Sequence, residues 1–250
     1  MKIDHDVMNV LAAARLDGDA LTLTGQLDRT LYGRTNAVIE AAGGKWSRRD
    51  KAHIFAGEAA MALEQVFATG EITTSKELGF FETQGAALDM LITAARIERG
   101  MTVLEPSAGA GAIAQRARSL GAKLYCIEID PARARLLEAA QFEPVICGDF
   151  LQMAQVAEFD RVSMNPPFAV PSDRRADLAH VRHAFGFLKP GGRLAAIMSA
   201  GISFRQDGIS AAFRAWADAR HAEWTLLPAG AFKASGTGVD TVLLTLDKDA

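Results

Sequence analysis

The sequence has few cysteines and no long apolar run. Two of its 250 residues are cysteines, Cys126 and Cys147, too few for the disulfide framework of a small secreted domain. Each lies in a strand-like apolar run, so we expect two reduced core thiols, although neighbouring strands could bring them together. No apolar run approaches the ~20 residues of a membrane helix, and the polar first six residues lack a signal-peptide pattern. We therefore expect a cytoplasmic protein with no membrane association.

The sequence also lacks a metal-ligand cluster and an excess of basic charge. Its five histidines are scattered, and only His180 and His183 share helical spacing, without a third ligand nearby, so no metal is expected. The net charge of −3 does not favour a nucleic-acid partner overall. Binding depends on local patches, however, so such a partner is not excluded. The length and the 49% hydrophobic content fit one large domain with a small companion, and the oligomeric state stays open.

Residues 1–72 are predicted to form a small accessory region of mixed helix and strand. Apolar residues recur at helical spacing in three segments, and two short segments alternate as strands do. The predicted helices are 5–16, 27–42 and 58–69, and the predicted strands are 20–24 and 52–55. This arrangement resembles a small winged module.

A basic segment with one aromatic residue lies inside this accessory region. It contains Lys45, Trp46, Arg48, Arg49 and Lys51. A solvated hairpin tip is one interpretation. A nucleic-acid contact is the other, because cations bind phosphates and the tryptophan could stack on a base.

Residues 73–250 alternate strand and helix, which predicts an α/β domain with a mostly parallel sheet covered by helices on both faces. The seven predicted strands are 101–104, 124–127, 144–147, 162–164, 193–199, 222–227 and 241–246. A turn at 189–192 is expected to lead into the fifth strand. Residues 231–238 are expected to form an exposed loop.

Polar and glycine residues follow the first three of these strands, at the edge where open α/β sheets bind ligands. Gly109 and Gly111 would let a ligand approach the backbone. Glu128, roughly 20 residues further on, could accept hydrogen bonds from both hydroxyls of a ribose. Asp149 could accept from an adenine amino group. Ile129 and Phe150 could enclose the adenine ring, so we expect a nucleoside site.

The fourth strand ends in the corner Asn165-Pro166-Pro167-Phe168. A proline holds the residue before it in extended geometry, and the two prolines have no N–H to donate. The corner therefore offers acceptors beside an aromatic ring, which suits a planar amine: oxygens of Asn165 and Pro166 accept its two hydrogens while Phe168 stacks on its ring. A rigid exit turn from a buried strand is the alternative.

Together these segments resemble a family. Residues 103–111 resemble the glycine-rich first motif of class I S-adenosylmethionine-dependent methyltransferases, and residues 81–84 resemble the segment that contacts the methionine end. The Asn-Pro-Pro-Phe corner resembles the catalytic motif of the amino-methylating DNA adenine methyltransferases. Residues 188–192 and 232–245 resemble later segments, so the resemblance covers about residues 78–248. The first 72 residues resemble, more loosely, regions of phage- or plasmid-borne methyltransferases.

The resemblance implies a Rossmann-like class I methyltransferase fold with a seven-stranded sheet, S-adenosylmethionine as cofactor and DNA as partner. Cofactor motifs precede the catalytic motif, as in one permuted class of these enzymes. Two departures matter: Gln84 stands where the family often has proline, and no large target-recognition domain follows the last strand. The residues assigned to the cofactor by the resemblance and the strand-end pattern are Phe81, Thr83, Gln84, Glu105, Pro106, Ser107, Ala108, Gly109, Gly111, Glu128, Ile129, Asp149, Phe150 and Asn165.

The predicted reaction is a direct displacement of the methyl group from a sulfonium by an amino nitrogen. It needs positioning more than a strong base, because the proton can leave after transfer. Arg174 and Arg175, just after the corner, could hold phosphates beside a base that has left its stack, or could lie in a solvated loop.

Several alternatives stay open. The same corner occurs in enzymes that methylate an amino group of an RNA base or a protein glutamine. A nicotinamide-dependent oxidoreductase would explain the glycine turn and Glu128 but not the corner, and a catalytically inactive nucleic-acid-binding module would leave the intact corner without a role. The sequence specifies neither the target site nor a restriction partner.

Overall fold

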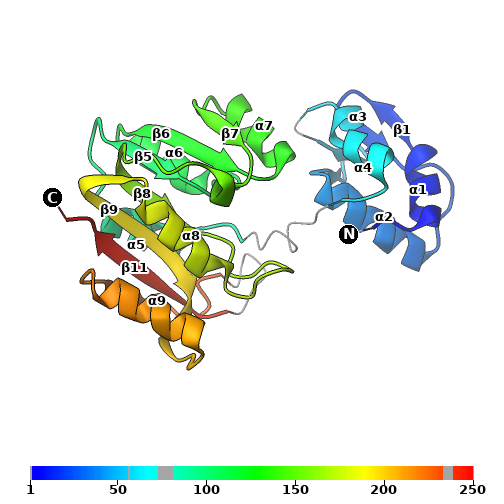
Figure 1. Cartoon of the computed structure of the whole chain (residues 1–250). Helices are drawn as coiled ribbons and strands as arrows, with labels where there is room; N and C mark the ends of the chain where they lie inside the picture. The colour runs from blue at the N-terminus through cyan, green and yellow to red at the C-terminus, as the bar shows by residue number, and fades with distance from the viewer. Residues whose placement is uncertain (1, 56, 73–80, 233–238, 250) are drawn as a thin grey trace. The chain divides into compact units, whose positions relative to one another are not determined.

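The computed structural model describes residues 2–55, 57–72, 81–232 and 239–249. The chain forms two compact units, Met1–Leu78 and Gly79–Ala250 (Figure 1). Among the described residues, no helix combines the length and the apolar character that crossing a membrane requires.

The first unit is a four-stranded antiparallel sheet with short helices. Its strands follow the order β1-β2-β4-β3. Buried apolar side chains, among them Val7, Leu21 and Ile39, form its own core. Its elements are α1 (His5–Ala12), β1 (Arg15–Asp17), β2 (Ala20–Thr22), α2 (Arg29–Ala41), β3 (Lys45–Ser47), β4 (Ala52–Ile54), α3 (Ala59–Ala62) and α4 (Glu64–Thr69).

The structure corrects three predicted boundaries in this unit. The first helix ends at Ala12, and Leu16 lies instead in β1, opposite Leu21 of β2. The second helix begins at Arg29 because the Asp28 carboxylate accepts hydrogen bonds from the backbone N–H groups of the first turn. The predicted helix 58–69 is divided into α3 and α4 at Leu63.

The second unit contains the predicted seven-stranded, mostly parallel sheet. Its strand order is β10-β11-β9-β8-β5-β6-β7, and only the pairs that involve β11 are antiparallel. Its elements are α5 (Gly85–Ala95), β5 (Thr102–Glu105), α6 (Ala112–Ser119), β6 (Lys123–Glu128), α7 (Pro131–Ala139), β7 (Val145–Cys147), a 3₁₀ turn η1 (Phe150–Gln152), β8 (Phe159–Met164), α8 (Ala176–Phe185), β9 (Leu188–Ser199), a 3₁₀ turn η2 (Ala200–Ser203), α9 (Gly208–Asp218), β10 (Glu223–Leu226) and β11 (Thr241–Asp247).

Helices cover both faces of this sheet, as predicted (Figure 1). Successive strand residues point to opposite faces, so Leu104 packs in one core with Val181 of α8 and Phe213 of α9. Its neighbour Val103 packs in the other core with Leu91 of α5. The fully buried strands explain the nearly continuous apolar runs in the sequence.

Strand β9 is longer than predicted. It begins at Leu188, and the segment 189–192 that was predicted as a turn belongs to the strand. The N–H of Gly191 donates to the carbonyl of Lys248, and the N–H of Lys248 donates to the carbonyl of Gly192. Pairing with the end of β11 therefore extends the strand through the two glycines.

The two cysteines differ in exposure. Both are free thiols, and Cys126 is buried, as expected. The prediction that Cys147 is a core residue is wrong, because it lies on the edge strand β7 and is exposed. The register places Cys147 opposite Glu128 rather than Cys126.

Strand order determines where a ligand can bind. From β5 the chain adds β6 and β7 on one side, then returns to place β8 and β9 on the other. A crevice forms at the carboxyl ends of strands where the order reverses in this way. The glycine turn follows β5 and the Asn-Pro-Pro-Phe corner follows β8, so the reversal brings the two motifs to adjacent strand ends.

Candidate active site

The glycine turn needs both of its glycines. Gly109 and Gly111 have φ angles of +55° and +82°, which side-chain-bearing residues rarely adopt. A Cβ on Gly111 would also lie 2.7 Å from a methyl carbon of Leu137, so this glycine lets α6 pack against α7. Between them, Ala110 is exposed at the surface of the turn.

Glu128 connects the glycine turn to the start of α7. Its carboxylate is 4% exposed. Oε2 accepts from the N–H of Gly109 at 2.6 Å. Oε1 accepts from the N–H of Asp130 at 2.9 Å and from Nε and Nη2 of Arg133 at 3.1 and 2.9 Å. A ribose at this position would therefore share the carboxylate with Arg133, a partner that sequence analysis did not identify.

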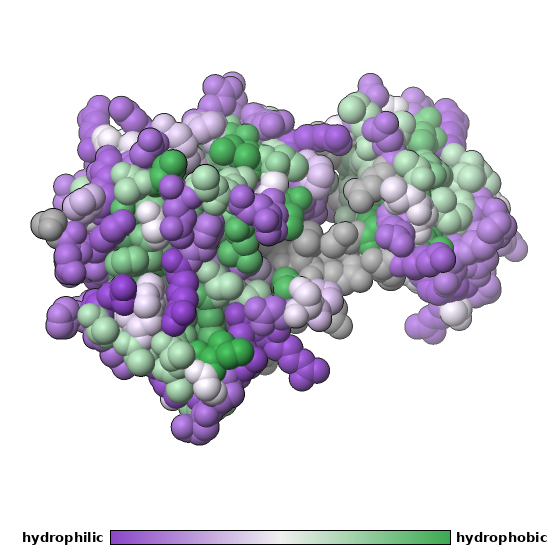
Figure 2. Space-filling view, in the orientation of Figure 1, coloured by the Kyte–Doolittle hydropathy of each residue, from purple (hydrophilic) through white to green (hydrophobic). Residues whose placement is uncertain are grey.

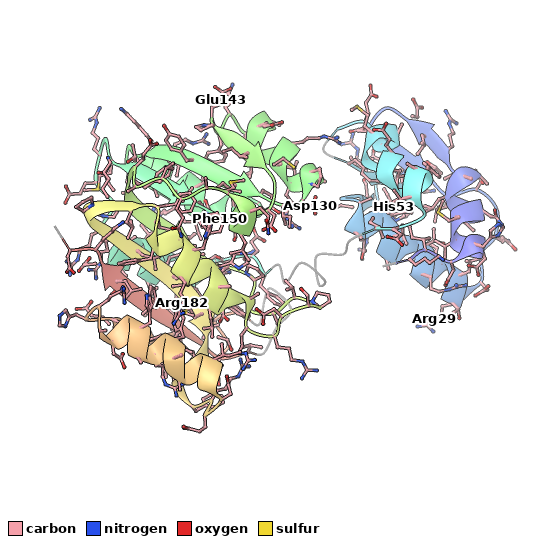
Figure 3. The ribbon with its side chains drawn as sticks, viewed as in Figure 1. Arg29, His53, Asp130, Glu143, Phe150 and Arg182 are labelled. Atoms are coloured by element: carbon pink, nitrogen blue, oxygen red, sulfur yellow. The ribbon has the colours of Figure 1, made fainter. Side chains whose placement is uncertain are left out.

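The residues expected around an adenine differ in accessibility. Ile129 is 48% exposed, and Asp149 is half-buried with its carboxylate accepting from the N–H of Leu151. Phe150 is buried, with its ring centroid 4.8 Å from that of His183 and 5.2 Å from that of Phe187 (Figure 3). Ile129 therefore offers an accessible apolar surface, whereas the ring of Phe150 is enclosed by the core.

The amide of Asn165 has a fixed orientation. Nδ2 donates to the carbonyl oxygen of Phe81 and to Oγ1 of Thr83, both at 2.9 Å. Because a carbonyl can only accept, the nitrogen must face Phe81. Oδ1 therefore points elsewhere, and it is buried without a hydrogen-bond partner among the described residues. A buried acceptor without a hydrogen bond lowers the stability of the folded state unless a ligand or a water molecule donates to it.

The 81–84 segment positions Asn165. Thr83 is buried and engaged with Asn165, and Gln84 is the N-cap residue of α5 without a side-chain capping bond. Gln84 is exposed, and its side chain donates to Glu82 at 2.5 Å.

The aromatic ring of the corner is enclosed in this structure. Phe168 is buried, with its centroid 6.3 Å from that of Phe81 in a stacked arrangement and 6.2 Å from that of Phe232 in a T-shaped one. Pro166 is buried, and Asn165 and Pro167 are half-buried. Phe232 is fully buried, which corrects its placement in an exposed loop; residues 233–238 of that loop lie outside the described residues.

A second unpartnered acceptor lies at the end of β5. Glu105 is buried, and its Oε2 has no hydrogen-bond partner in the described part of the chain. Burial raises the pKa of its carboxyl well above the ordinary value, and the nearby Glu128 raises it further. After it, Pro106 and Ala108 are buried and Ser107 is half-buried. Two orphaned acceptors on neighbouring strands fit a ligand that carries N–H donors.

The predicted nucleic-acid residues lie in two places. In the first unit, Lys45, Trp46, Arg48, Arg49 and Lys51 are exposed on β3 and the turn that follows it. Trp46 is an edge-strand residue whose ring centroid is 5.1 Å from that of His53. All five side chains are therefore accessible, and the segment is both basic and aromatic.

The two arginines after the corner behave differently. Arg174 is exposed. The guanidinium of Arg175 forms an ion pair with Asp207, the N-cap residue of α9, and is 29% exposed. Arg175 therefore ties the loop after the corner to the start of α9, and Arg174 is the accessible cation of the two.

The described residues contain no group of three or more metal-ligating side chains arranged to hold an ion.

Comparison with known proteins identifies relatives of part of the chain. No family model matches it. A protein from Methanosarcina mazei described as ribosomal RNA small subunit methyltransferase A is 34% identical over 102 residues, 39% of this chain and 36% of the relative. Its counterpart from Methanosarcina acetivorans is 30% identical over 105 residues, 40% of this chain and 39% of the relative. The matched stretch spans little more than a third of these relatives.

Solved structures match more of the chain at lower identity. A Listeria monocytogenes protein described as a class I S-adenosylmethionine-dependent methyltransferase has a TM-score of 0.53 and 17% identity, covering 76% of this chain and 66% of its own. A modification subunit of a type I restriction enzyme from Vibrio vulnificus has a TM-score of 0.55 and 19% identity, covering 76% and 48%. A Pyrococcus horikoshii protein described as an RNA methyltransferase has a TM-score of 0.53 and 22% identity, covering 75% and 98%.

The second unit therefore has the class I S-adenosylmethionine-dependent methyltransferase fold, as the sequence resemblance predicted. About two fifths of the chain is also similar in sequence to proteins described as ribosomal RNA small subunit methyltransferase A.

Proposed function

We propose that this chain transfers a methyl group from S-adenosylmethionine to the exocyclic amino group of adenine in DNA. The observation that carries the proposal is the amide of Asn165. Its nitrogen is engaged by Phe81 and Thr83, and its buried oxygen lacks a partner among the described residues. That oxygen suits one hydrogen of a planar amine.

S-adenosylmethionine would supply an activated methyl group on its sulfonium. The residues that would hold it are at the carboxyl ends of β5, β6 and β7. Glu105 offers a buried carboxyl with an unpartnered oxygen, and the positive charge of an ammonium group bound there would favour its ionised, accepting form. Glu128 would accept from the ribose hydroxyls, and Asp149 and Ile129 would contact the adenine ring. The helix α6 begins directly behind the glycine turn, so its first N–H groups add positive potential there.

The corner would act on the nucleophile. Asn165 Oδ1 and the Pro166 carbonyl would accept the two amino hydrogens and hold the nitrogen lone pair out of the ring plane. The prolines cannot donate, so they leave no N–H to compete for the amine. Positioning of this kind contributes up to about 7–11 kcal/mol to rate acceleration. Pro167 fixes the chain direction, and Phe168 would pack near the base.

DNA is proposed as the acceptor because the Asn-Pro-Pro-Phe corner resembles that of the DNA adenine methyltransferases. The exposed cations and Trp46 of the first unit support a nucleic-acid partner, since phosphate contacts and base stacking supply most sequence-independent affinity. Arg174 adds an exposed cation on the loop after the corner.

A second candidate is adenine in RNA. It is favoured by the partial sequence match to proteins described as ribosomal RNA small subunit methyltransferase A. Both candidates require the same amine geometry at Asn165. DNA and RNA must therefore be distinguished by identifying the methylated product.

The test is to incubate the protein with methyl-labelled S-adenosylmethionine and, separately, DNA, RNA and a protein release factor. Digestion and mass spectrometry then identify the labelled nucleoside or residue. We expect N6-methyldeoxyadenosine from DNA. Label in N6-methyladenosine alone would move the assignment to RNA. Label on glutamine alone, or no transfer to any acceptor, would overturn the proposal.

A further inference from the structure

A surface pocket lies beyond the residues assigned to the cofactor and the amine. It has a volume of about 480 Å³ and includes neither the glycine turn nor the Asn-Pro-Pro-Phe corner. Its lining comes from the end of β9, the segment after it, the end of β10 and the two residues before β11. The lining includes Ser199, Gly201, Phe204, Arg205, Leu226 and Asp240.

The pocket opens at the same edge of the sheet as Asn165. Met164, the residue before Asn165, is in register with Ala196 of β9, and Ser199 is three residues further along that strand. Thr241 is opposite Ser199, and Val242 is opposite Leu226. With a rise of about 3.3 Å per residue and strands about 4.8 Å apart, the pocket begins roughly 8–11 Å from the corner.

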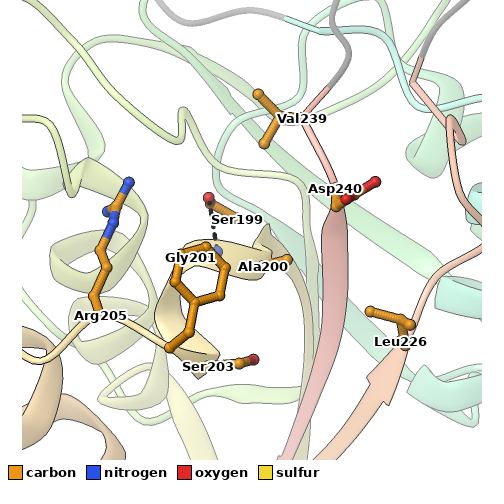
Figure 4. A pocket seen from close by; sticks show the side chains of 9 residues that line it. Ser199, Ala200, Gly201, Ser203, Arg205, Leu226, Val239 and Asp240 are labelled. Atoms are coloured by element: carbon orange, nitrogen blue, oxygen red, sulfur yellow. Dashed lines mark hydrogen bonds between the residues drawn. The ribbon is translucent and has the colours of Figure 1, made fainter.

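The pocket combines exposed apolar surface with a cation. Phe204 is 69% exposed and Leu226 is 71% exposed, unusually high values for large apolar side chains. Figure 2 shows apolar side chains at the surface beside one end of α9, between hydrophilic regions. Figure 4 shows Arg205 on one side of the pocket and Leu226, Val239 and Asp240 on the other.

Arg205 is available to an anion. Within the part of the chain that the structure describes, its guanidinium takes part in no ion pair or hydrogen bond, although it lies close enough to Asp177 to lower the pKa of that buried carboxyl. Its side chain also packs over Gly201: a Cβ there would lie 2.9 Å from Nε. The cation is thus placed at the pocket by packing rather than by a carboxylate partner.

Hydrogen bonds to side chains of α8 and α9 fix the segment that carries Phe204 and Arg205. Nη1 of Arg214 on α9 donates to the carbonyl of Ile202 at 2.6 Å and to that of Arg205 at 2.8 Å. The buried carboxylate of Asp177 accepts from the N–H of Ser199 at 3.1 Å. These charge-assisted bonds fix the backbone at both ends of the segment 199–205, so Phe204 and Arg205 are presented from a preformed loop.

We propose that this pocket binds a nucleotide that flanks the target adenine in the same strand, with Phe204 stacking on its base and Arg205 contacting its phosphate. The inference rests on the proposed function, because it needs a nucleic-acid acceptor at Asn165. A base has an apolar face beside a fixed negative charge, and the pocket presents the complementary pair.

The experiment compares Phe204→Ala and Arg205→Gln with the control Ile209→Ala. Ile209 is 58% exposed on α9 and does not line the pocket, so its truncation removes similar apolar surface elsewhere. Methyl transfer is measured on a single-stranded oligonucleotide whose target adenine has been mapped. We expect Phe204→Ala to raise KM about tenfold with kcat unchanged, as loss of one stacked base predicts, and Ile209→Ala to change neither. Arg205→Gln should raise KM and reduce the salt dependence of binding.

Abasic substitutions locate the contact. Each position beside the target adenine is replaced in turn by an abasic site. One position should be the one whose base occupies the pocket. An oligonucleotide that is abasic at that position should bind the wild-type protein more weakly than the intact oligonucleotide does. Phe204→Ala should not weaken the binding of that abasic oligonucleotide any further. The inference is overturned if the wild type methylates the oligonucleotide but Phe204→Ala matches Ile209→Ala, or if the Phe204→Ala loss is unchanged at every abasic position. A wild type that methylates no nucleic acid would instead refute the proposed function.

Discussion

The polar groups at the end of β6 and at the end of β8 differ in how many hydrogen-bond partners the protein gives them. On the β6 side, the Glu128 carboxylate accepts from Gly109, Asp130 and Arg133. On the β8 side, the Asn165 oxygen has no partner among the described residues, and the next two residues are prolines without N–H groups. The carboxylate proposed to hold a ribose is therefore satisfied by the protein's own hydrogen bonds, whereas the amide proposed to hold the amine leaves an oxygen for what binds there, as does Glu105 of β5 between them.

The largest expected effect is that of Asn165→Ala. Loss of the amide oxygen removes an acceptor that positions the amine, so we expect kcat for methyl transfer to fall by about 10²–10³ or more, the range for one preorganised polar group. The dissociation constant for S-adenosylmethionine, measured by calorimetry, should stay near that of the wild type. Turnover at the wild-type rate would show that the unpartnered oxygen has no role in transfer.

The second prediction concerns the buried carboxyl of Asp177 and how it changes the stability of the protein with pH. Its side chain is 2% exposed, and burial raises its pKa from 3.8 to about 6. The folded state therefore binds the carboxyl proton of Asp177 more tightly than the unfolded state does. The contribution of Asp177 to the free energy of unfolding declines as pH rises from about 4 to about 6, by up to about 3 kcal/mol. Asp177→Asn removes that titration.

The measurement is urea denaturation of Asp177→Asn and the wild type at pH 4.5, 6 and 7.5. Asparagine presents an NH2 to one of the two N–H groups bound by Asp177, so the variant starts less stable at pH 4.5. Its free energy of unfolding should then improve relative to the wild type as pH rises. A difference that is constant with pH would contradict the raised pKa.

Glu128→Ala tests the cofactor side. A carboxylate that accepts from ribose hydroxyls contributes about 1.5–3 kcal/mol, so we expect S-adenosylmethionine to bind about 10- to 100-fold more weakly. Glu138→Ala, an exposed glutamate on α7, is the matched control and should leave the dissociation constant unchanged. If wild type and Glu128→Ala bound S-adenosylmethionine equally well, the carboxylate of Glu128 would serve only Arg133 and Gly109, and it would not bind a ribose.

The smallest expected effect concerns the basic surface of the first unit. If Arg48 contacts a phosphate, Arg48→Ala should reduce the slope of log K against log salt for DNA binding by about 1. Lys123→Ala is the control, because Lys123 is an exposed cation at the amino end of β6, away from the site. The slopes are measured by fluorescence anisotropy between low and moderate salt, and identical slopes for both variants would remove Arg48 from the interface.

Much of the second unit followed from local pattern. Apolar runs separated by amphipathic segments predicted the strands and helices, and glycines and acids at strand ends predicted the edge that binds ligands. Errors arose where pairing partners are distant. The extension of β9 to Leu188 depends on Lys248, and the burial of Phe232 depends on Phe168. No window of sequence around Leu188 or Phe232 contains those partners.

Three residues of the proposed sites were not predicted from the sequence, for different reasons. Arg133 has one local signal, its i,i+3 spacing from Asp130, with which it forms an ion pair at 3.2 Å. Its contact with Glu128 joins the end of β6 to α7 and has no such helical spacing. Phe204 and Arg205 gave no signal, because their exposure depends on how β9, β10 and β11 end together.

The sequence by itself determined the alternation of strands and helices, the two glycines whose positive φ angles only glycine tolerates readily, and a corner whose prolines cannot donate hydrogen bonds. These are properties of covalent structure and short-range sterics. Only the tertiary structure decided which oxygen of the site is left without a partner, because that depends on Phe81 and Thr83 reaching Asn165 across more than eighty residues of chain. Long-range packing selects which polar groups are satisfied internally, and therefore which remain for a ligand.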